Sequence, residues 1–185
     1  MIRLFVAVDF PEDVRERLAG LQGGVPGARW SEPDALHLTL RFIGEVPEDQ
    51  AHDIDAALAE VRAPAFPLTL DGVGSFGHGR GARLLWAGVE RSDALAHLAA
   101  KVESALVRTG LPAEERKFTP HVTLARLRDA NADRVARFLS ERSFFRAGPF
   151  LVDHVTLYRS HLGKGGSVYE PLASYALASP DSEQV

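Results

Sequence analysis

The chain has 185 residues, a net charge of −4 and a sequence pI near 6.0, and 45% of its residues are hydrophobic. This length suffices for one domain, or for two small lobes that share an interface. The sequence contains no Cys, which excludes disulfides and thiolate chemistry. Its acidic balance argues against binding a DNA duplex, which needs a broadly basic face. No stretch approaches the roughly 18 apolar residues of a membrane helix, so we expect a cytoplasmic protein without a membrane partner.

Strands and helices are predicted in alternation along the chain. Apolar runs and alternating patterns predict strands at 2–10, 36–43, 66–76, 84–89, 122–127, 150–158 and 169–177. Apolar stripes with start and stop signals predict helices from 11 to before 23, and at 47–61, 92–109 and 132–141, with Ser92 as an N-cap. This order indicates an α+β fold, with one domain over 1–179 and a polar tail over 180–185.

The Gly-rich segment 77–81 has the composition of a phosphate-binding loop. It lacks the Gly-Lys-Ser/Thr ending and the following helix of such a loop. We therefore predict that it is a hairpin loop between two strands.

A His-apolar-Thr-apolar tetrad occurs three times, at 37–40, 121–124 and 154–157. Residues two apart in a strand share a face, so each copy presents an imidazole beside a hydroxyl and turns its apolar residues the other way. Two such strands side by side would bring two His and two Thr into one groove. One imidazole can act as an acid and the other as a base, while the hydroxyls bind phosphate oxygens. This arrangement favours a phosphodiester as substrate. In its cleavage, one proton is taken from the attacking oxygen and one is given to the leaving oxygen.

Two other interpretations compete with this one, an ordinary strand pair and a metal site. A single His-X-Thr pair in a strand is commonly an ordinary surface pair, and one of three copies can be accidental. A zinc site would need spacings such as His-X-His or His-Glu-X-X-His, and the sequence has neither. We therefore expect no metal and no cofactor.

Several segments resemble the RNA 2′,3′-cyclic phosphodiesterases, also called 2′-5′ RNA ligase-like proteins, of the 2H phosphoesterase superfamily. They are RLFVAVDFP at 3–11, LHLTLRFIGEV at 36–46, KFTPHVTLARL at 117–127 and LYRSHLGKGGSVYEPL at 157–172. The resemblance implies two pseudo-symmetric lobes, each an antiparallel sheet flanked by helices, around a central concave groove. It also implies metal-independent hydrolysis of a 2′,3′-cyclic phosphate, on an RNA end or a nucleotide, to the 2′-phosphate. We expect the protein to act as a monomer.

The resemblance also implies roles for the first two tetrads. His37 would be the acid that protonates the leaving 3′ oxygen, and His121 the base that activates water. Thr39 and Thr123 would hold the phosphoryl oxygens.

Three further side chains are candidates for substrate binding. In the family, an Arg five residues after the second His contacts phosphate and a Phe five residues after the first lies near the base, which here are Arg126 and Phe42. Strict alternation puts both on the apolar face, so they reach the groove only if each strand twists, bulges or ends there. Packing in the core is an open alternative for Phe42. Arg41 shares the parity of His37 and is expected to approach the substrate.

The third tetrad lacks the family's flanking residues, so His154 and Thr156 are predicted to be ordinary strand residues. The same site could instead join a cyclic end to a 5′-hydroxyl and form a 2′-5′ linkage. A nucleotide-binding module without turnover is a further alternative. Two His and two Thr argue against it, because binding alone needs no acid–base pair.

Overall fold

The computed structural model describes residues 1–179, and the polar tail predicted at 180–185 lies outside the described residues. The strands are β1 Ile2–Val8, β2 Arg29–Trp30, β3 Leu38–Val46, β4 Phe66–Phe76, β5 Leu84–Val89, β6 Val122–Arg126, β7 Arg146–Val152, β8 His154–Gly163 and β9 Gly166–Ala176. The helices are α1 Glu12–Ala19, α2 Glu48–Ala59, α3 Asp93–Arg108 and α4 Ala132–Glu141, with 3₁₀ turns η1 Pro33–Ala35 and η2 Gly79–Gly81.

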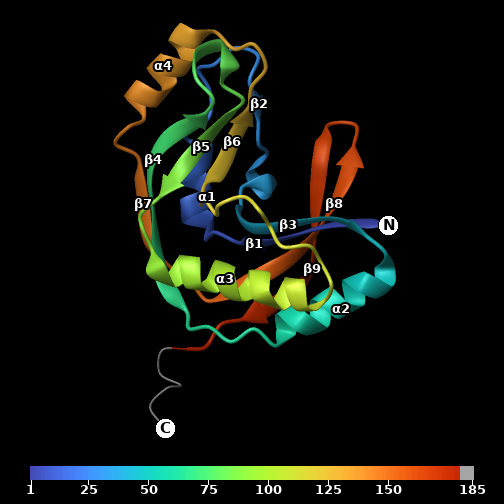
Figure 1. The fold of residues 1–185 in the computed structure, drawn as a ribbon. Coiled ribbons are helices and arrows are strands. Elements are labelled where there is room, and N and C mark those ends of the chain that lie inside the picture. The colour runs from blue at the N-terminus through green and yellow to red at the C-terminus, as the bar shows by residue number, and fades with distance from the viewer. Residues whose placement is uncertain (180–185) are drawn as a thin grey trace.

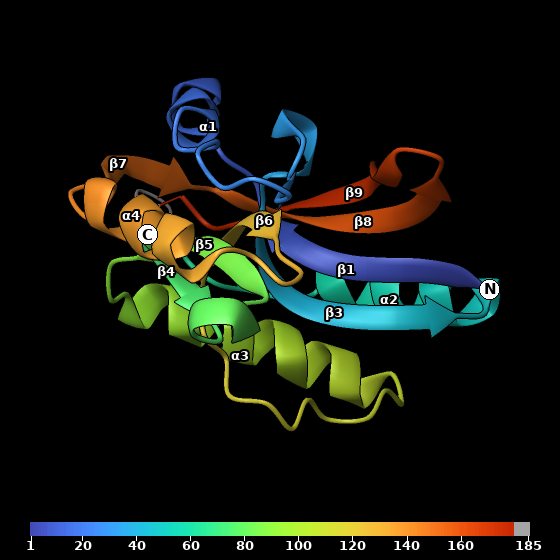
Figure 2. The same ribbon diagram turned by 90° about the horizontal axis from the view of Figure 1, so that it is seen from above.

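The α+β class is confirmed, and the strands of both expected lobes belong to one antiparallel sheet. Its order is β7-β4-β5-β6-β3-β1-β8-β9. The short strand β2 also pairs with β6, at Ala125 and Arg126. The two halves meet where β3 and β6 pair through Leu38 and Val122. The sheet is strongly curled, with α1 on one side and α2 and α3 on the other (Figures 1 and 2). The expected pair of separate sheets is therefore corrected to two halves of a single sheet.

Most predicted elements are present, but the strand predicted at 150–158 was wrong. Strand pairing is interrupted at Asp153, and the segment forms parts of two strands, of which β7 pairs with β4 and β8 pairs with β1. These partners lie in opposite halves of the sheet. The error arose because the interruption is a single residue and no Gly or Pro marks it. By contrast, the predicted cap of α3 is confirmed, since Ser92 Oγ accepts a hydrogen bond from the Leu95 amide at 3.1 Å.

The core on the α2 and α3 side of the sheet explains why these two helices form. Apolar residues of α3 recur every three or four positions, and Leu95, Leu98, Val102 and Leu106 are all fully buried. Burying a side chain of this size stabilises the fold by about 1.5–3 kcal/mol. This packing holds β3 and β4, which α3 contacts, in fixed positions.

Gly74 and Trp86, which pair across β4 and β5, make a close contact. A Cβ on Gly74 would lie 2.2 Å from Cζ2 of the Trp86 ring. The indole therefore lies flat on β4 only because residue 74 has no side chain.

We predict that Gly74→Ala destabilises the protein by about 1–3 kcal/mol, the usual cost of overpacking. Thermal unfolding followed by circular dichroism would measure it. Gly81→Ala is the matched control, because its Cβ would meet nothing within 4 Å. Equal melting temperatures for the two variants would contradict the assigned contact.

Candidate active site

The pairing of β3 with β6 brings the first two tetrads together. Leu38 and Val122, the second residues of their tetrads, lie directly opposite each other and are fully buried. Antiparallel register then places the His of each tetrad across from the Thr of the other, on the opposite face. The two His lie on a diagonal, with Cα atoms about 7–8 Å apart. We call these four residues the His-Thr quartet: His37, Thr39, His121 and Thr123.

His37 is the more buried imidazole of the quartet, with 7% of its surface exposed. Its ring lies 4.5 Å from the Tyr158 ring, centroid to centroid, and its Nε2 is 3.5 Å from a carboxylate oxygen of Asp9. Burial lowers the pKa of His37, and the Asp9 carboxylate offsets part of that effect. Nδ1 is buried without a hydrogen-bond partner, and the Ala35 backbone makes a smaller contribution that raises the pKa of the ring.

His121 is held by its own backbone. Its Nδ1 lies 2.7 Å from the carbonyl oxygen of Thr119, two residues earlier, and its ring meets the edge of Phe76 at 4.9 Å. A carbonyl oxygen can only accept, so Nδ1 carries a proton and donates it. The neutral ring then has a free, basic Nε2. Nε2 of His121 is thus left for proton transfer, whereas Nε2 of His37 lies beside the Asp9 carboxylate.

A β-bulge in β3 decides which side chains share the face of the quartet. Along β1, Ala7 pairs with Thr39 and the next residue, Val6, pairs with Arg41, so Leu40 has no partner. The extra residue shifts by one position the alternation of the β3 side chains between the two faces of the sheet. Phe42 therefore lies on the face of Thr39, against the groove-side residues of β1.

Phe42 lies outside the core, with 57% of its surface exposed. Its ring centroid is 6.0 Å from that of Phe5, whose own ring lies 6.3 Å from His37. The structure thus brings an exposed aromatic face beside the quartet.

The same distortion occurs in β6 at the equivalent residue. Thr123 pairs with Trp86 and Ala125 pairs with Leu85, so Leu124 has no partner on β5. The shift turns Arg126 to the face of Thr123, where it is exposed. The bulges thus explain how a side chain five residues after each His reaches the groove face.

Arg29 is a groove residue that the sequence alone did not reveal. It pairs with Arg126 across β2 and β6, so both guanidinium groups lie on one face. Within residues 1–179, neither Arg has a salt bridge. No sequence pattern predicted a strand at Arg29, because β2 has only two residues and is too short to show an alternating pattern.

Arg41 lies on the other face of β3 from the quartet, although it lines the cavity that opens beside the quartet. The bulge turns it to the α3 side, where Nε donates to Glu103 at 2.5 Å. Its two terminal nitrogens donate to the carbonyls of Phe42 and Pro112, both at 2.6 Å. The side chain therefore ties β3 to α3 and to the segment that leads to His121.

The third tetrad is also more than an ordinary stretch of strand. Thr156 Oγ1 donates to Asp9 Oδ2 at 2.6 Å, and His154 Nε2 lies 3.1 Å from the same oxygen. The Tyr158 hydroxyl donates to Asp9 Oδ1, the oxygen nearest His37. The third tetrad and Tyr158 thus surround a carboxylate that contacts the quartet. Sequence analysis missed Asp9, and its only signal was an acidic residue directly after a buried strand.

A cavity of about 540 Å³ opens beside the quartet. It extends from Thr39 and His121 past Phe42 to an alanine-rich face of α3 and to the segment 114–119. A volume of this size is typical of small-molecule sites.

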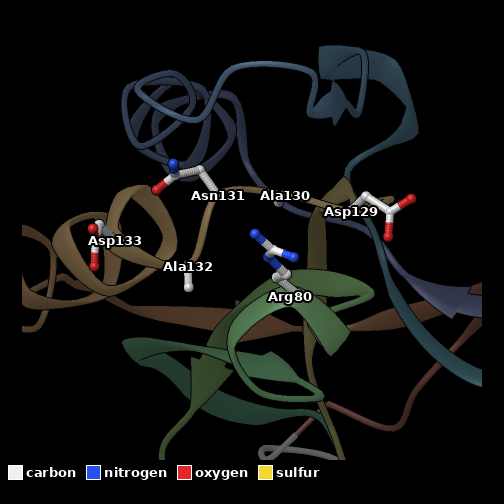
Figure 3. Close-up of a pocket in the computed structure, with 6 residues that line it drawn as sticks. All are labelled: Arg80, Asp129, Ala130, Asn131, Ala132 and Asp133. Carbon is white, nitrogen blue, oxygen red and sulfur yellow. The ribbon is translucent and has the colours of Figure 1, made fainter.

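A second hollow of about 420 Å³ lies beyond the end of β6, between η2 and the start of α4. Figure 3 shows Arg80 extending from η2 toward the segment 129–133. As predicted, the Gly-rich segment joins the two antiparallel strands β4 and β5, so it has no phosphate-loop topology. Asn131 in this hollow caps α4, since its side-chain oxygen accepts from the Arg134 amide at 3.1 Å.

Within residues 1–179, no group of three or more His, Cys, Asp or Glu is arranged to hold a metal ion. No helix in the same range is long and apolar enough to cross a membrane.

Two cross-strand His-Thr tetrads in a curled antiparallel sheet define a class of protein, and similarity to known proteins identifies that class. The model of the 2′-5′ RNA ligase superfamily matches residues 10–164, so the chain belongs to this superfamily. It is 35% identical to an RNA 2′,3′-cyclic phosphodiesterase of Archaeoglobus fulgidus, over 92% of this chain and 98% of the relative. It is 33% identical to that of Escherichia coli, over 95% and 96%. The crystal structure of E. coli LigT complexed with 3′-AMP superposes with a TM-score of 0.76 and 32% identity, over 96% and 98%.

We predict that Phe42→Ala changes the free energy of unfolding by less than about 1 kcal/mol, because the side chain is mostly exposed. Phe5→Ala, in which a fully packed ring of the same type is lost, should cost about 3–5 kcal/mol. Urea unfolding of both variants measures the difference. A loss for Phe42→Ala as large as for Phe5→Ala would mean that Phe42 is a core residue.

Proposed function

We propose that this protein hydrolyses the 2′,3′-cyclic phosphate of RNA ends or nucleotides to the 2′-phosphate, without a metal ion. The observation that carries the proposal is the His-Thr quartet, in which two imidazoles and two hydroxyls share one face. Membership of the superfamily and the names of its relatives support the same reaction.

The proposed step forms one bond to phosphorus and breaks another. A water oxygen attacks phosphorus while the bond to the 3′ oxygen breaks, and the 2′ oxygen keeps the phosphate. His121 Nε2 takes the proton from the water, and His37 Nε2 gives its proton to the 3′ oxygen. An in-line displacement has these oxygens on opposite sides of phosphorus, which suits two imidazoles on a diagonal. Each positioned acid or base contributes typically about 10²–10⁴ in rate.

The surrounding residues have the chemistry to bind the rest of the substrate. The Thr39 and Thr123 hydroxyls can donate to the non-bridging phosphate oxygens. Arg126 adds a positive charge on the same face, and Phe42 presents an aromatic face to a nucleobase. The cavity beside the quartet has room for a nucleoside. The 3′-AMP complex of the E. coli relative supports a nucleotide ligand.

We expect hydrolysis of nucleoside 2′,3′-cyclic phosphates to continue in excess EDTA, because the quartet supplies both proton transfers. Phosphorus NMR of the products should show the 2′-phosphate alone. A 3′-phosphate product would mean that the substrate lies in the opposite orientation. Activity that vanishes in chelator and returns with a divalent ion would overturn the metal-free mechanism.

Replacing His37 or His121 by Ala should each lower kcat by at least about 10²-fold, since each removes one proton-transfer group. The double variant should lose far less than the product of both losses, because the pair acts as a unit. His154→Ala is the matched control from the third tetrad, and its kcat should stay within a few-fold of wild type. Steady-state kinetics, with circular dichroism as a folding check, would test this. An inactive but folded His154→Ala beside an active His121→Ala would refute the assignment.

A further inference from the structure

We propose that Asp9 is the positioning residue of His37, and that β8 holds the Asp9 carboxylate in place through the hydroxyls of Thr156 and Tyr158. The negative charge of Asp9, 3.5 Å from Nε2 of His37, favours the protonated form of the buried imidazole and helps to orient the ring. This inference rests on the proposed function, in which His37 is the general acid.

The sheet explains how the third tetrad reaches the first. β1 lies between β3 and β8, and Ala7 of β1 pairs with Thr39 on one side and Thr156 on the other. Both hydroxyl residues therefore lie in one row across the sheet, separated by a small side chain. Asp9 follows two residues later, just past the end of β1, beside both tetrads.

The Asp9 carboxylate is built into a hydrogen-bond network on its β8 side. It has only 19% of its side chain exposed, and donors from Thr156, Tyr158 and His154 reach its two oxygens. Burial alone would raise the pKa of Asp9, but the hydrogen bonds outweigh it, so the pKa lies below its usual value. The group therefore remains an anion throughout the neutral range.

His37 needs this anion because its other surroundings oppose a positive charge. Its ring lies among the rings of Phe5, Tyr158 and Tyr169, and burial is the largest effect on its pKa. Arg15 of α1 lowers the pKa further.

Among the groups that favour the charged ring, Asp9 has the largest effect, ahead of the Ala35 carbonyl and Asp34. The Asp34 carboxylate is fully exposed and lies 3.9 Å from Arg15. Asp9 is thus the main group that favours the charged form of the proposed general acid at this position.

His154 shares the carboxylate but is not essential to it. Burial would lower the pKa of His154, but hydrogen bonds to Asp153 and Asp9 outweigh it, so the pKa is raised. Its side chain is 38% exposed, and Asp9 keeps two other donors when it is removed. This accounts for the mild effect expected of His154→Ala.

The test is Asp9→Asn, which keeps the shape and removes the charge. The Cε1 proton of His37, assigned by its loss in His37→Ala, is titrated by NMR in the ligand-free protein. We expect its midpoint to move to lower pH by about 1 pH unit, as for loss of an opposite charge at this distance. The basic limb of kcat/KM should move the same way, so that acidification recovers part of the activity lost at neutral pH.

Asp55→Asn is the matched control, because Asp55 of α2 also accepts a hydrogen bond from a tyrosine, Tyr175 of β9, at 2.6 Å. It should leave both the His37 midpoint and the pH profile unchanged. If Asp9→Asn does not fold, Asp9→Ser gives the same test, since it also removes the charge and keeps a hydrogen-bonding group.

An unchanged His37 midpoint in a folded Asp9 variant would overturn the inference, whatever the activity. Equal shifts in the Asp9 and Asp55 variants would overturn it too. The NMR titration does not depend on turnover, so it separates this inference from the proposed function. If the wild-type protein did not hydrolyse cyclic nucleotides, the proposed function would fail while the titration still tested Asp9.

Discussion

One residue pair, Leu38 with Val122, joins the two halves of the sheet, and the site depends on it. Both side chains are fully buried, so a slip of either strand by one residue would expose its apolar side chains and turn its imidazole toward the core. The same burial that stabilises the sheet therefore sets the face on which the quartet lies. Site geometry and core packing have a common determinant here, which is the register of two strands more than 80 residues apart in the chain.

The two bulges extend this arrangement from four residues to six. An unbroken strand would turn Phe42 and Arg126 away from the quartet, because their spacing from each His is odd. The unpaired Leu40 and Leu124 reverse that parity in both strands. The equivalent positions then carry different chemistry, an aromatic ring in one half of the sheet and a guanidinium group in the other. In the proposed function, one half faces the base and the other faces the phosphate.

The three tetrads show that one sequence pattern can have different roles. The first two lie on strands that meet, so their side chains face each other. The third lies across β1 from the first, where its His and Thr bind the Asp9 carboxylate. A hydroxyl beside an imidazole suits either role, because both can donate hydrogen bonds to an anion. The neighbouring strand decides whether that anion is a side chain of the protein or, as proposed, a phosphate.

Local pattern alone determined much of this protein. The strands at 66–76 and 84–89, the helix at 132–141 and the cap at Ser92 all follow from short-range periodicity and capping, and the structure has them as predicted. The sequence also marked the first two tetrads as a pair. Only the tertiary structure decided the single sheet, the two bulges, the turn of Arg41 toward α3 and the contact of Asp9 with His37. These features depend on partners far away in the chain, such as Thr156 for Asp9, 147 residues apart, and no local pattern encodes which strands become neighbours.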